Sequence, residues 1–521
     1  MRIYVHHRND DIDETADVLL EKDSWDDYGF ETKFRVWIRT GKEFDRIGSI
    51  KIGHVGQKEK PDASAKTVFP KGILGELPDG YFSIGQSENF YDSLQEVGTD
   101  FAKELLDFLH DLAAQEFIPQ QILDEDVYKY SLMRNLSDSD VIQFKRLARG
   151  DTRKIAYSFS YTCNIGKDGP SLSFEVMPTS PIPTNLHAII GSNGVGKTTL
   201  FKDLVQVIGF NERGGPSVID FTSEDVATSD QSSFKKIVFV SFSVFDQEQI
   251  AKQILGAARL KAEFIGLLKI VDVDQEADRD EDILFEANDA PTPETEQLVL
   301  MSRDALFETL LESAKNCMQG GNKKRWFSSL DALGIDPLFE DLHLRGLENS
   351  ENFEIDLRVI FDRCSSGHAI SLLAVTRLVE LVEERTLVLF DEPESHLHPP
   401  LLSALLSVVN SVVTERNAIA IVATHSPVVL QEVPKMCVWL LTRSGDEMEA
   451  FRPTLETLGE NVGVLTREIF ELQMRKTGFN RIIHRLVNDG LDAKAVIAQF
   501  NGSLGSEGRS LVHSLIKNRD R

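Results

Sequence analysis

Residues 191–198 read GSNGVGKT, which satisfies the G-x-x-x-x-G-K-[ST] pattern of a phosphate-binding loop. The apolar stretch LHAII precedes the loop and TTLFKDL follows it, so a strand, a glycine turn and a helix succeed one another as such a loop requires. Backbone N–H groups there wrap phosphates, Lys197 reaches the β and γ phosphates, and Thr198 offers a hydroxyl to magnesium. We therefore expect a nucleoside triphosphate to contact Gly191, Ser192, Asn193, Gly194, Val195, Gly196, Lys197, Thr198 and Thr199.

A second apolar stretch, TLVLFDE at 386–392, ends in two carboxylates. Asp391 is placed to hold magnesium, and Glu392 to orient or deprotonate the attacking water. A third strand-like stretch, AIAIVATH, ends at His425, which we expect to sense the γ-phosphate. Each feature alone has a structural alternative, an acidic pair closing a strand or a core histidine. The order in which both stretches follow the glycine loop favours an ATP and Mg²⁺ site with Glu392 and His425 in catalysis.

The chain alternates strand-like and helix-like stretches around these motifs, which indicates an α/β fold with a parallel sheet. Residues 251–355 contain EFIGLLKI and RDALFETLLESAKNCM, whose apolar stripes predict helices. We therefore divide the chain into an N-terminal α+β lobe (1–165), a core with the glycine loop (166–250), a mostly helical insertion with an acidic loop (251–355), the rest of the core (356–450) and a C-terminal helical segment (451–521).

Composition excludes several classes of protein. The net charge of −27 argues against unaided, non-specific binding to DNA, because phosphate neutralisation needs clustered Lys and Arg. The start, MRIYVHHRNDDIDE, is acidic where a signal peptide is apolar, and no apolar run approaches the length of a membrane span. The four cysteines form no CxxC pair, which argues against a disulfide framework and a zinc hook. We expect a cytoplasmic protein that does not bind membranes.

The acidic stretch that begins at Asp272 has aspartates spaced as in a calcium-binding loop. Ala277 stands where such a loop needs Gly, and Ile283 where it needs the closing Glu. The stretch is therefore interpreted as a solvated acidic loop.

Residues 361–373 read FDRCSSGHAISLL, in which a serine precedes an apolar helical run, as at an ordinary helix cap. In ATP-binding-cassette (ABC) ATPases an LSGGQ signature occupies such a helix start shortly before the Walker B strand, and this chain resembles that superfamily. The likeness is to the branch with SMC and Rad50 heads, through DEPESHLHP, ATHSP and the large insertion. The resemblance implies a homodimer or higher homo-oligomer in which Ser365, Ser366 and Gly367 bind the γ-phosphate held by the opposite subunit.

The chain departs from that signature at three positions: Cys364 replaces Leu, Ser366 replaces Gly and His368 replaces Gln. We therefore expect slow hydrolysis. The superfamily's glutamine loop has only Gln247 or Gln249 as a counterpart here.

A narrower resemblance lies in PTNLHAIIGSNGVGKTTL, VSFSVFD, EFIGLLK, SSGHAI and DEPESHLHP. Together they resemble the ATPases of bacterial anti-phage systems, particularly the PtuA type of Septu systems and related retrons. The resemblance implies an ATPase that dimerises around ATP, senses infection and controls a partner HNH nuclease of the PtuB type. Contact with nucleic acid, either the retron RNA and DNA or the target, would come through the complex.

Alternatives remain open. A DNA repair or maintenance ATPase of the SMC and Rad50 kind is disfavoured by the lack of a long coiled coil. An overcoming-lysogenization nuclease would need a Toprim domain after the ATPase, for which the C-terminal segment is too short and too helical. A PARIS-type defence ATPase with a different toxin is the close alternative. The histidines of ESHLHPP, His396 and His398, are expected to shape the turn and the dimer contact, so the chain itself is not expected to be a nuclease.

Overall fold

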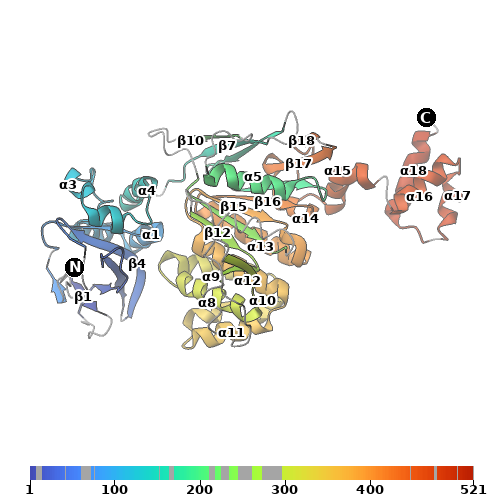
Figure 1. Ribbon diagram of the computed structural model, residues 1–521. Coiled ribbons are helices and arrows are strands. Elements are labelled where there is room, and N and C mark those ends of the chain that lie inside the picture. The colour runs from blue at the N-terminus through green and yellow to red at the C-terminus, as the bar shows by residue number, and fades with distance from the viewer. Residues whose placement is uncertain are drawn as a thin grey trace, which may run out of the picture.

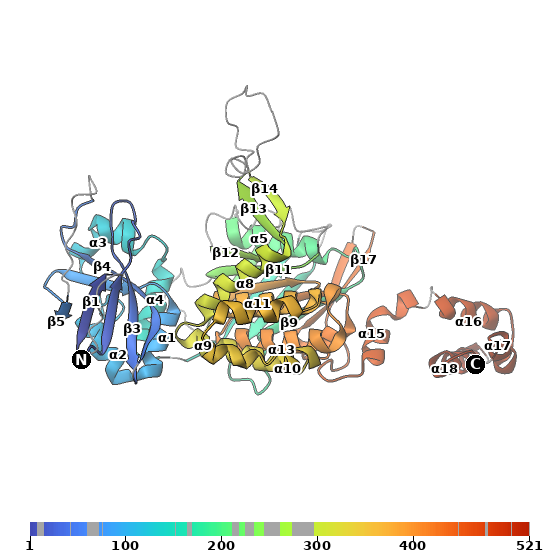
Figure 2. The same cartoon turned by 90° about the horizontal axis from the view of Figure 1, so that it is seen from below.

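The computed structural model describes residues 1–7, 15–41, 43–59, 72–75, 77–151, 153–163, 169–210, 218–223, 234–243, 261–272, 296–445, 447–474, 478–501 and 503–519. Three bodies follow one another in both views: an N-terminal α+β unit, a large core and a group of C-terminal helices (Figures 1 and 2).

The centre of the core is a seven-stranded sheet. In spatial order its strands are β12 (Lys261–Ile265), β11 (Lys236–Ser241), β15 (Thr386–Asp391), β16 (Ile419–Thr424), β9 (Leu186–Gly191), β17 (Val438–Ser444) and β18 (Glu447–Phe451). All neighbours are parallel except β17 and β18. Strands β9, β11, β15 and β16 are buried along their whole length, as parallel strands covered on both faces must be. The expected α/β fold with a parallel P-loop sheet is confirmed.

Helix α5 (Lys197–Phe210) covers one face of this sheet. A three-stranded antiparallel sheet of β10 (Val218–Ser223), β7 (Tyr157–Thr162) and β8 (Ser171–Val176) lies above the helix (Figure 1). Leu200, Phe201 and Leu204 of the helix pack in one hydrophobic cluster with side chains of both sheets, such as Phe159 and Phe239. The resemblance to ABC ATPase heads implies an antiparallel β lobe beside the parallel sheet, and this three-stranded sheet has that position.

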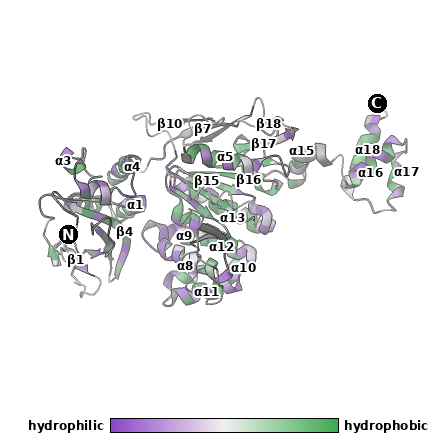
Figure 3. Ribbon diagram, in the orientation of Figure 1, coloured by the Kyte–Doolittle hydropathy of each residue, from purple (hydrophilic) through white to green (hydrophobic). Residues whose placement is uncertain are grey.

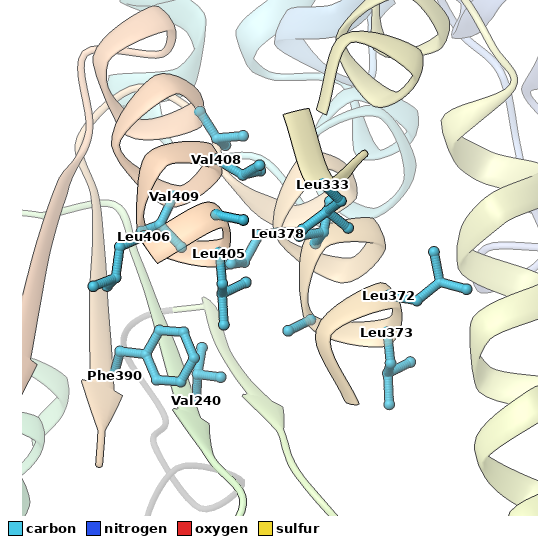
Figure 4. Close-up of a cluster of buried hydrophobic side chains, with 14 of the residues drawn as sticks. Val240, Leu333, Leu372, Leu373, Leu378, Phe390, Leu405, Leu406, Val408 and Val409 are labelled. Atoms are coloured by element: carbon cyan, nitrogen blue, oxygen red, sulfur yellow. The ribbon is translucent and has the colours of Figure 1, made fainter. Parts of the chain in front are cut away.

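Helices cover the opposite face: α8 (Arg303–Cys317), α9 (Gly321–Leu333), α10 (Pro337–Asp341), α11 (Phe353–Arg363), α12 (Ser366–Leu381) and α13 (Pro399–Glu415), with the 3₁₀ turn η2 (Leu344–Asn349). Figure 4 shows Leu378 of α12 and Leu405 of α13 among side chains that include Val240 and Phe390 of the sheet. Each such side chain contributes about 1.5–3 kcal/mol by leaving water. The sheet and these helices therefore form one core.

The segment 251–355 differs from the expected helical insertion in its first half. The apolar residues of EFIGLLKI form strands rather than a helix: β12 joins the edge of the central sheet, and β13 (Leu268–Asp272) pairs with β14 (Glu296–Leu300). Figure 2 shows this hairpin projecting from the core. Its second half is helical, as expected, from α8 to α11. The calcium-loop positions Ala277 and Ile283 lie outside the described residues.

The N-terminal unit has its own sheet, with strands in the order β5 (Gly72–Leu74), β1 (Ile3–His7), β2 (Val18–Lys22), β3 (Lys33–Thr40), β4 (Glu43–His54) and β6 (Tyr81–Gly85). Its helices are α1 (Glu88–Val97), α2 (Thr99–Phe108), α3 (Gln120–Leu123), the π-helical turn η1 (Val127–Leu132) and α4 (Asp138–Ala148). A separate hydrophobic cluster fills it.

Two details of this unit differ from the expectation. Strand β7, the last strand within the lobe expected over 1–165, belongs instead to the antiparallel sheet above α5. The apolar pattern of FAKELLDFLHDLAAQEF (101–117) predicts one helix, but α2 ends at Phe108 and the chain turns at His110, whose φ of 47° is left-handed.

Charged side chains join the N-terminal unit to the core. Arg146 and Gln143 of α4 both contact Glu384, and Arg416 pairs with Asp92 of α1. The Glu384 N–H donates to Glu88 Oε2 across 3.0 Å. A polar cavity of about 480 Å³ lies between the two units at these residues.

Short turns η3 (Pro393–His396), α14 (Pro427–Leu430) and η4 (Lys435–Cys437) complete the core. After it come α15 (Val462–Met474), α16 (Gly478–Asn488), α17 (Ala493–Gln499) and α18 (Ser506–Arg519). The last three share a small hydrophobic cluster, and Figure 3 shows both hydrophobic and hydrophilic stretches on them. The four cysteines are buried. Within the described residues, no helix combines the length and the apolarity that crossing a membrane requires.

Candidate ATP-binding site

The glycine loop joins the carboxyl end of β9 to the start of α5. Gly194 and Gly196 have φ values of 79° and 109°, which L side chains rarely adopt, so the loop needs glycine at both positions. Lys197 is buried, and its Nζ donates to the carbonyls of Gly191 at 3.1 Å and Ser192 at 3.4 Å. The expected loop residues therefore share one turn at a helix N-terminus, where free N–H groups suit phosphate.

Asp391 comes to the same place because β15 and β9 flank β16. In the register of this sheet Asp391 lies opposite Ala423, and Thr424 opposite Ile190. The carboxyl ends of the three strands therefore meet, and the Thr198 hydroxyl donates to Asp391 Oδ2 across 2.9 Å.

Glu392 has a left-handed backbone, with φ 47° and ψ 59°. For a residue other than glycine this conformation costs on the order of 1 kcal/mol. The hydrogen bond from its N–H to Ala423 O, 2.9 Å long, stabilises the turn. Its Oε1 lies 3.7 Å from Lys197 Nζ and 3.7 Å from His425 Nδ1. The structure thus places the predicted carboxylate between the loop lysine and the predicted histidine.

Glu394 is a site residue that sequence reasoning missed. Only 8% of its side-chain surface is exposed, and its Oε1 accepts hydrogen bonds from Thr424 Oγ1 at 2.6 Å, from His425 N–H at 2.7 Å and from Ser426 N–H at 3.2 Å. His425 Nδ1 lies 3.1 Å from the same oxygen. Glu394 therefore holds the backbone that carries His425. The signal in the sequence is a third acid in DEPES, two residues after Glu392.

Hydroxyl and carboxylate oxygens are the ligands that Mg²⁺ prefers, and Thr198 and Asp391 supply one of each side by side. These residues fit the expected magnesium ion. The expected glutamine loop residues, Gln247 and Gln249, lie outside the described part of the chain.

The signature residues lie elsewhere in the subunit. Ser365 caps α12 by accepting the His368 N–H, and Gly367 lies so close to the next loop that a Cβ would be 2.6 Å from His396 O. Helix α12 packs on the face of the sheet opposite α5. Among the described residues no hydrogen bond or ion pair joins Ser365, Ser366 or Gly367 to the glycine loop. The structure does not bring the two halves of the expected site together within one chain.

Three potential metal ligands lie beside this signature: atoms of Asp336, His368 and His398 are within 4.8 Å of one another. His368 Nε2 is 2.9 Å from Asp336 Oδ1, and His398 Nε2 is 3.3 Å from Asp336 Oδ2. The Leu401 N–H donates to His398 Nδ1, so the hydrogen of that neutral ring is on Nε2, which points at Asp336. The three groups are therefore satisfied by hydrogen bonds to one another.

The histidines of ESHLHPP hold the turn after β15, as expected. His398 caps α13 through the hydrogen bond from Leu401, and His396 Nε2 lies 3.0 Å from Phe242 O. Neither approaches the phosphate loop through any hydrogen bond of the described residues.

Residues 186–431 match the family model described as "AAA domain, putative AbiEii toxin, Type IV TA system". The chain is 34% identical over 527 residues to Protein ea59 of Escherichia phage lambda, across 96% of this chain and 95% of that protein. A stretch of 80 residues is 31% identical to the thiamine import ATP-binding protein ThiQ of Photobacterium profundum. This stretch covers 15% of this chain and 32% of that protein.

Two solved structures show weaker likeness. The ADP conformation of an ATP-binding cassette of an ABC transporter matches with a TM-score of 0.28 and 14% identity, covering 62% of this chain and 99% of that chain. UvrA2 from Deinococcus radiodurans matches with a TM-score of 0.29 and 14% identity, covering 65% of this chain and 43% of that one. The strand order β12-β11-β15-β16-β9-β17-β18 of the central sheet defines the fold of the core.

Proposed function

The chain belongs to the family of Protein ea59 and carries an ATPase domain of the AAA and ABC type, and on that premise we propose that it binds ATP with Mg²⁺ and hydrolyses it slowly. The observation that carries the proposal is the meeting of four groups at one sheet edge: Lys197, the Thr198 and Asp391 pair, and Glu392.

Each residue has a role that its position supports. Lys197 turns from the carbonyls of its own loop to the β and γ phosphates, exchanging neutral acceptors for charged ones. Thr198 and Asp391 would hold Mg²⁺, which when bound neutralises charge on the phosphates. Glu392 orients the attacking water and accepts its proton, and His425 contacts the γ-phosphate.

We propose that the second half of the site comes from another copy of the chain. Ser365, Ser366 and Gly367 start a helix of sixteen residues, whose free N–H groups and positive end suit a phosphate. Ser365 and Ser366 are exposed, and α12 lies across the sheet from the subunit's own glycine loop. Two chains arranged head to tail would complete two such sites.

The test uses Glu392→Gln, which keeps the size of the side chain but removes the carboxylate. With ATP and magnesium this variant should sediment as a dimer and retain ATP, whereas wild type should return to the monomer as ATP is consumed. A variant that hydrolyses ATP at the wild-type rate would show that Glu392 is not the catalytic carboxylate. A variant that keeps ATP as a monomer would exclude the composite site.

We further propose that the ATPase belongs to an anti-phage system and that its ATP-bound dimer controls a partner nuclease of the HNH type. The motif resemblance to PtuA supports this, and the family model's description names a toxin and a toxin–antitoxin system. That description also favours a second candidate, control of a toxin that is not a nuclease. A pull-down of the full chain from its host, followed by mass spectrometry and by nuclease assays on DNA and RNA, separates the two.

A further inference from the structure

The last three helices, α16 to α18, form a small unit that takes no part in the ATP site. A hydrophobic cluster separate from those of the core holds them together through Ile483, Val487, Val496, Leu504 and Val512. Figures 1 and 2 show these helices beyond α15, away from the central sheet. The unit therefore has a core of its own and a surface available to other molecules.

The charge of this unit is opposite in sign to that of the whole chain. Residues 478–521 contain seven Lys or Arg and four Asp or Glu, which gives a net charge of +3. The rest of the chain then has 49 Lys or Arg and 79 Asp or Glu, which gives −30. Neutralising phosphates needs clustered Lys and Arg rather than a basic chain overall, so this unit meets a requirement that the whole chain does not.

Most of these cations are not used by the fold of the unit. Arg509 donates to Leu504 O, and Arg519 donates to the carbonyl of Val487, so these two support the fold. Four others are exposed and make no hydrogen bond or ion pair with any described residue: Arg481, Arg485, Lys494 and Lys517. These four are therefore available to a negatively charged ligand.

Helix stability does not explain the positions of Arg481 and Lys494. Arg481 is the fourth residue of α16 and Lys494 is the second of α17, so both lie near the positive end of a helix dipole, which disfavours a cation. Asp492, by contrast, caps α17 by accepting the Ala495 N–H at 2.8 Å, as a helix start favours. A partner with negative charge accounts for the two cations where local structure does not.

The distribution of the cations indicates the kind of partner. Arg481 and Arg485 are four positions apart on α16 and so share one face, whereas Lys494 lies on α17 and Lys517 on α18. Single charges spread over three helices suit a polymer with regularly spaced negative charges. A nucleic-acid backbone is such a polymer.

The exposed apolar surface of α16 is too small for the unit to lie in a membrane surface. Ile483 and Val487 are buried in the unit's own core, which leaves Phe479 and Ile482 at the surface, 40% and 43% exposed. A helix that lies in a membrane interface turns a whole apolar face to the lipid. An exposed ring beside arginines can instead stack on a nucleic-acid base.

We propose that α16 to α18 bind the phosphate backbone of a nucleic acid, DNA or RNA, through Arg481, Arg485, Lys494 and Lys517. Contacts to phosphate carry no sequence information, so binding should not depend on sequence and should weaken steeply with salt. None of these residues belongs to the ATP site, so the proposal stands or falls independently of the proposed ATPase activity.

The experiment measures binding of the full chain to labelled duplex DNA, single-stranded DNA and RNA of one mixed sequence by fluorescence anisotropy. We expect a dissociation constant of about 1–100 µM near physiological salt. The logarithm of the association constant should fall linearly with the logarithm of the salt concentration, by about 0.9 per phosphate contact on duplex DNA and about 0.7 on a single strand. The nucleic acid that binds most tightly identifies the source of the phosphates.

The chain with both Arg481→Gln and Arg485→Gln should lose about two phosphate contacts, so its salt slope should become shallower by about 1.8 on duplex DNA or about 1.4 on a single strand. The matched control combines Lys103→Gln and Lys324→Gln, which remove two exposed cations from α2 and α9, and it should keep the wild-type slope. Equal slopes for wild type and the arginine variant would overturn the proposal.

Asp489→Asn removes an exposed carboxylate directly after α16. It should tighten binding by about two- to fivefold, the order of a surface charge interaction, and misfolding cannot produce such a gain. Absence of binding to all three nucleic acids would overturn the proposal. Binding to vesicles that contain phosphatidylserine, without binding to any nucleic acid, would also overturn it and assign the unit to an anionic membrane.

Discussion

The Thr198 hydroxyl donates to Oδ2 of Asp391 across 2.9 Å, although the two residues are 193 positions apart. Thr198 lies in the first turn of the helix after β9, and Asp391 closes β15, two strands away in the sheet. Their contact depends on the parallel strand order, which brings the carboxyl ends of both strands to one edge. The pair therefore places a hydroxyl and a carboxylate oxygen, two kinds of ligand that Mg²⁺ prefers, side by side next to the phosphate loop.

Asp391→Asn should keep the hydrogen bond to Thr198 and remove the charge that would hold magnesium. We expect ATP hydrolysis to fall by about 100-fold or more, since electrostatic groups at reacting phosphates contribute on that order. Magnesium should also cease to strengthen ATP binding, which titration calorimetry with and without the ion measures. Asp341→Asn, an exposed substitution on α10, is the matched control. Unaltered magnesium dependence in Asp391→Asn would remove Asp391 from the site.

Lys197→Ala should weaken ATP binding with the fold retained. The ammonium group makes its present hydrogen bonds to two loop carbonyls and would exchange them for phosphate oxygens. Hydrogen bonds to charged groups contribute about 1.5–3 kcal/mol, which corresponds to an affinity loss of about 10- to 100-fold. Calorimetric titration checks the affinity, and circular dichroism the fold. Lys324→Ala, at an exposed position of α9, should bind ATP as wild type does. Equal affinities of the two variants would refute the loop assignment.

Local patterns predict the parts of the fold that depend on local chemistry. The strand, glycine turn and helix at 186–210 are visible in the sequence because the glycines, the apolar run and the helix start are contiguous. The cap of α12 is visible for the same reason, since Ser365 accepts a hydrogen bond from a residue only three positions away.

Contacts between residues far apart in the sequence determine the parts of the fold and of the site that local patterns do not predict. The run EFIGLLKI carries apolar residues that suit a helix or a strand, and the parallel pairing of β12 with β11 at the sheet edge decides for the strand. Asp336 lies 32 residues before His368, and Glu394 lies 31 residues before His425, so neither partnership leaves a local pattern. The sequence indicates an α+β lobe at the N-terminus but does not show that this unit has a hydrophobic core of its own. That core depends on pairings such as the parallel one of β1 with β2, which no local pattern reveals.

Glu394→Ala should lower kcat and leave the ATP dissociation constant nearly unchanged. The substitution removes the acceptor of three hydrogen bonds that fix Thr424, His425 and Ser426, so His425 loses its position relative to Glu392. A displacement of about 1 Å at a reacting centre costs about 100-fold. Glu394→Gln keeps an acceptor oxygen and should recover part of the loss. Steady-state phosphate release and calorimetry measure the two quantities separately. A loss confined to ATP affinity would show that Glu394 acts on binding rather than on the position of His425.

Glu88→Gln should flatten the pH dependence of stability. Burial raises the pKa of Glu88 to about 8, with Lys235 opposing that shift, while the unfolded chain has the ordinary value of 4.5. Between these two values the native state holds a proton that the unfolded state releases. The contribution of Glu88 to the free energy of unfolding is therefore fully present below about pH 4.5 and is lost as the pH rises through 8. The loss is on the order of a few kcal/mol.

The amide that Glu88→Gln introduces stays neutral, and its oxygen can still accept the Glu384 N–H that now bonds to Glu88 Oε2 at 3.0 Å. We therefore expect the variant to lose less stability than wild type between pH 6 and 9, with the difference in urea midpoint largest at the alkaline end. Glu96→Gln, at an exposed position of the same helix, should follow wild type. Glu88 lies where α1 meets the core. The stability that Glu88→Gln retains at alkaline pH should therefore come from the contact between the N-terminal unit and the ATPase core. Parallel pH profiles for wild type and Glu88→Gln would mean that Glu88 is already ionised in the native protein.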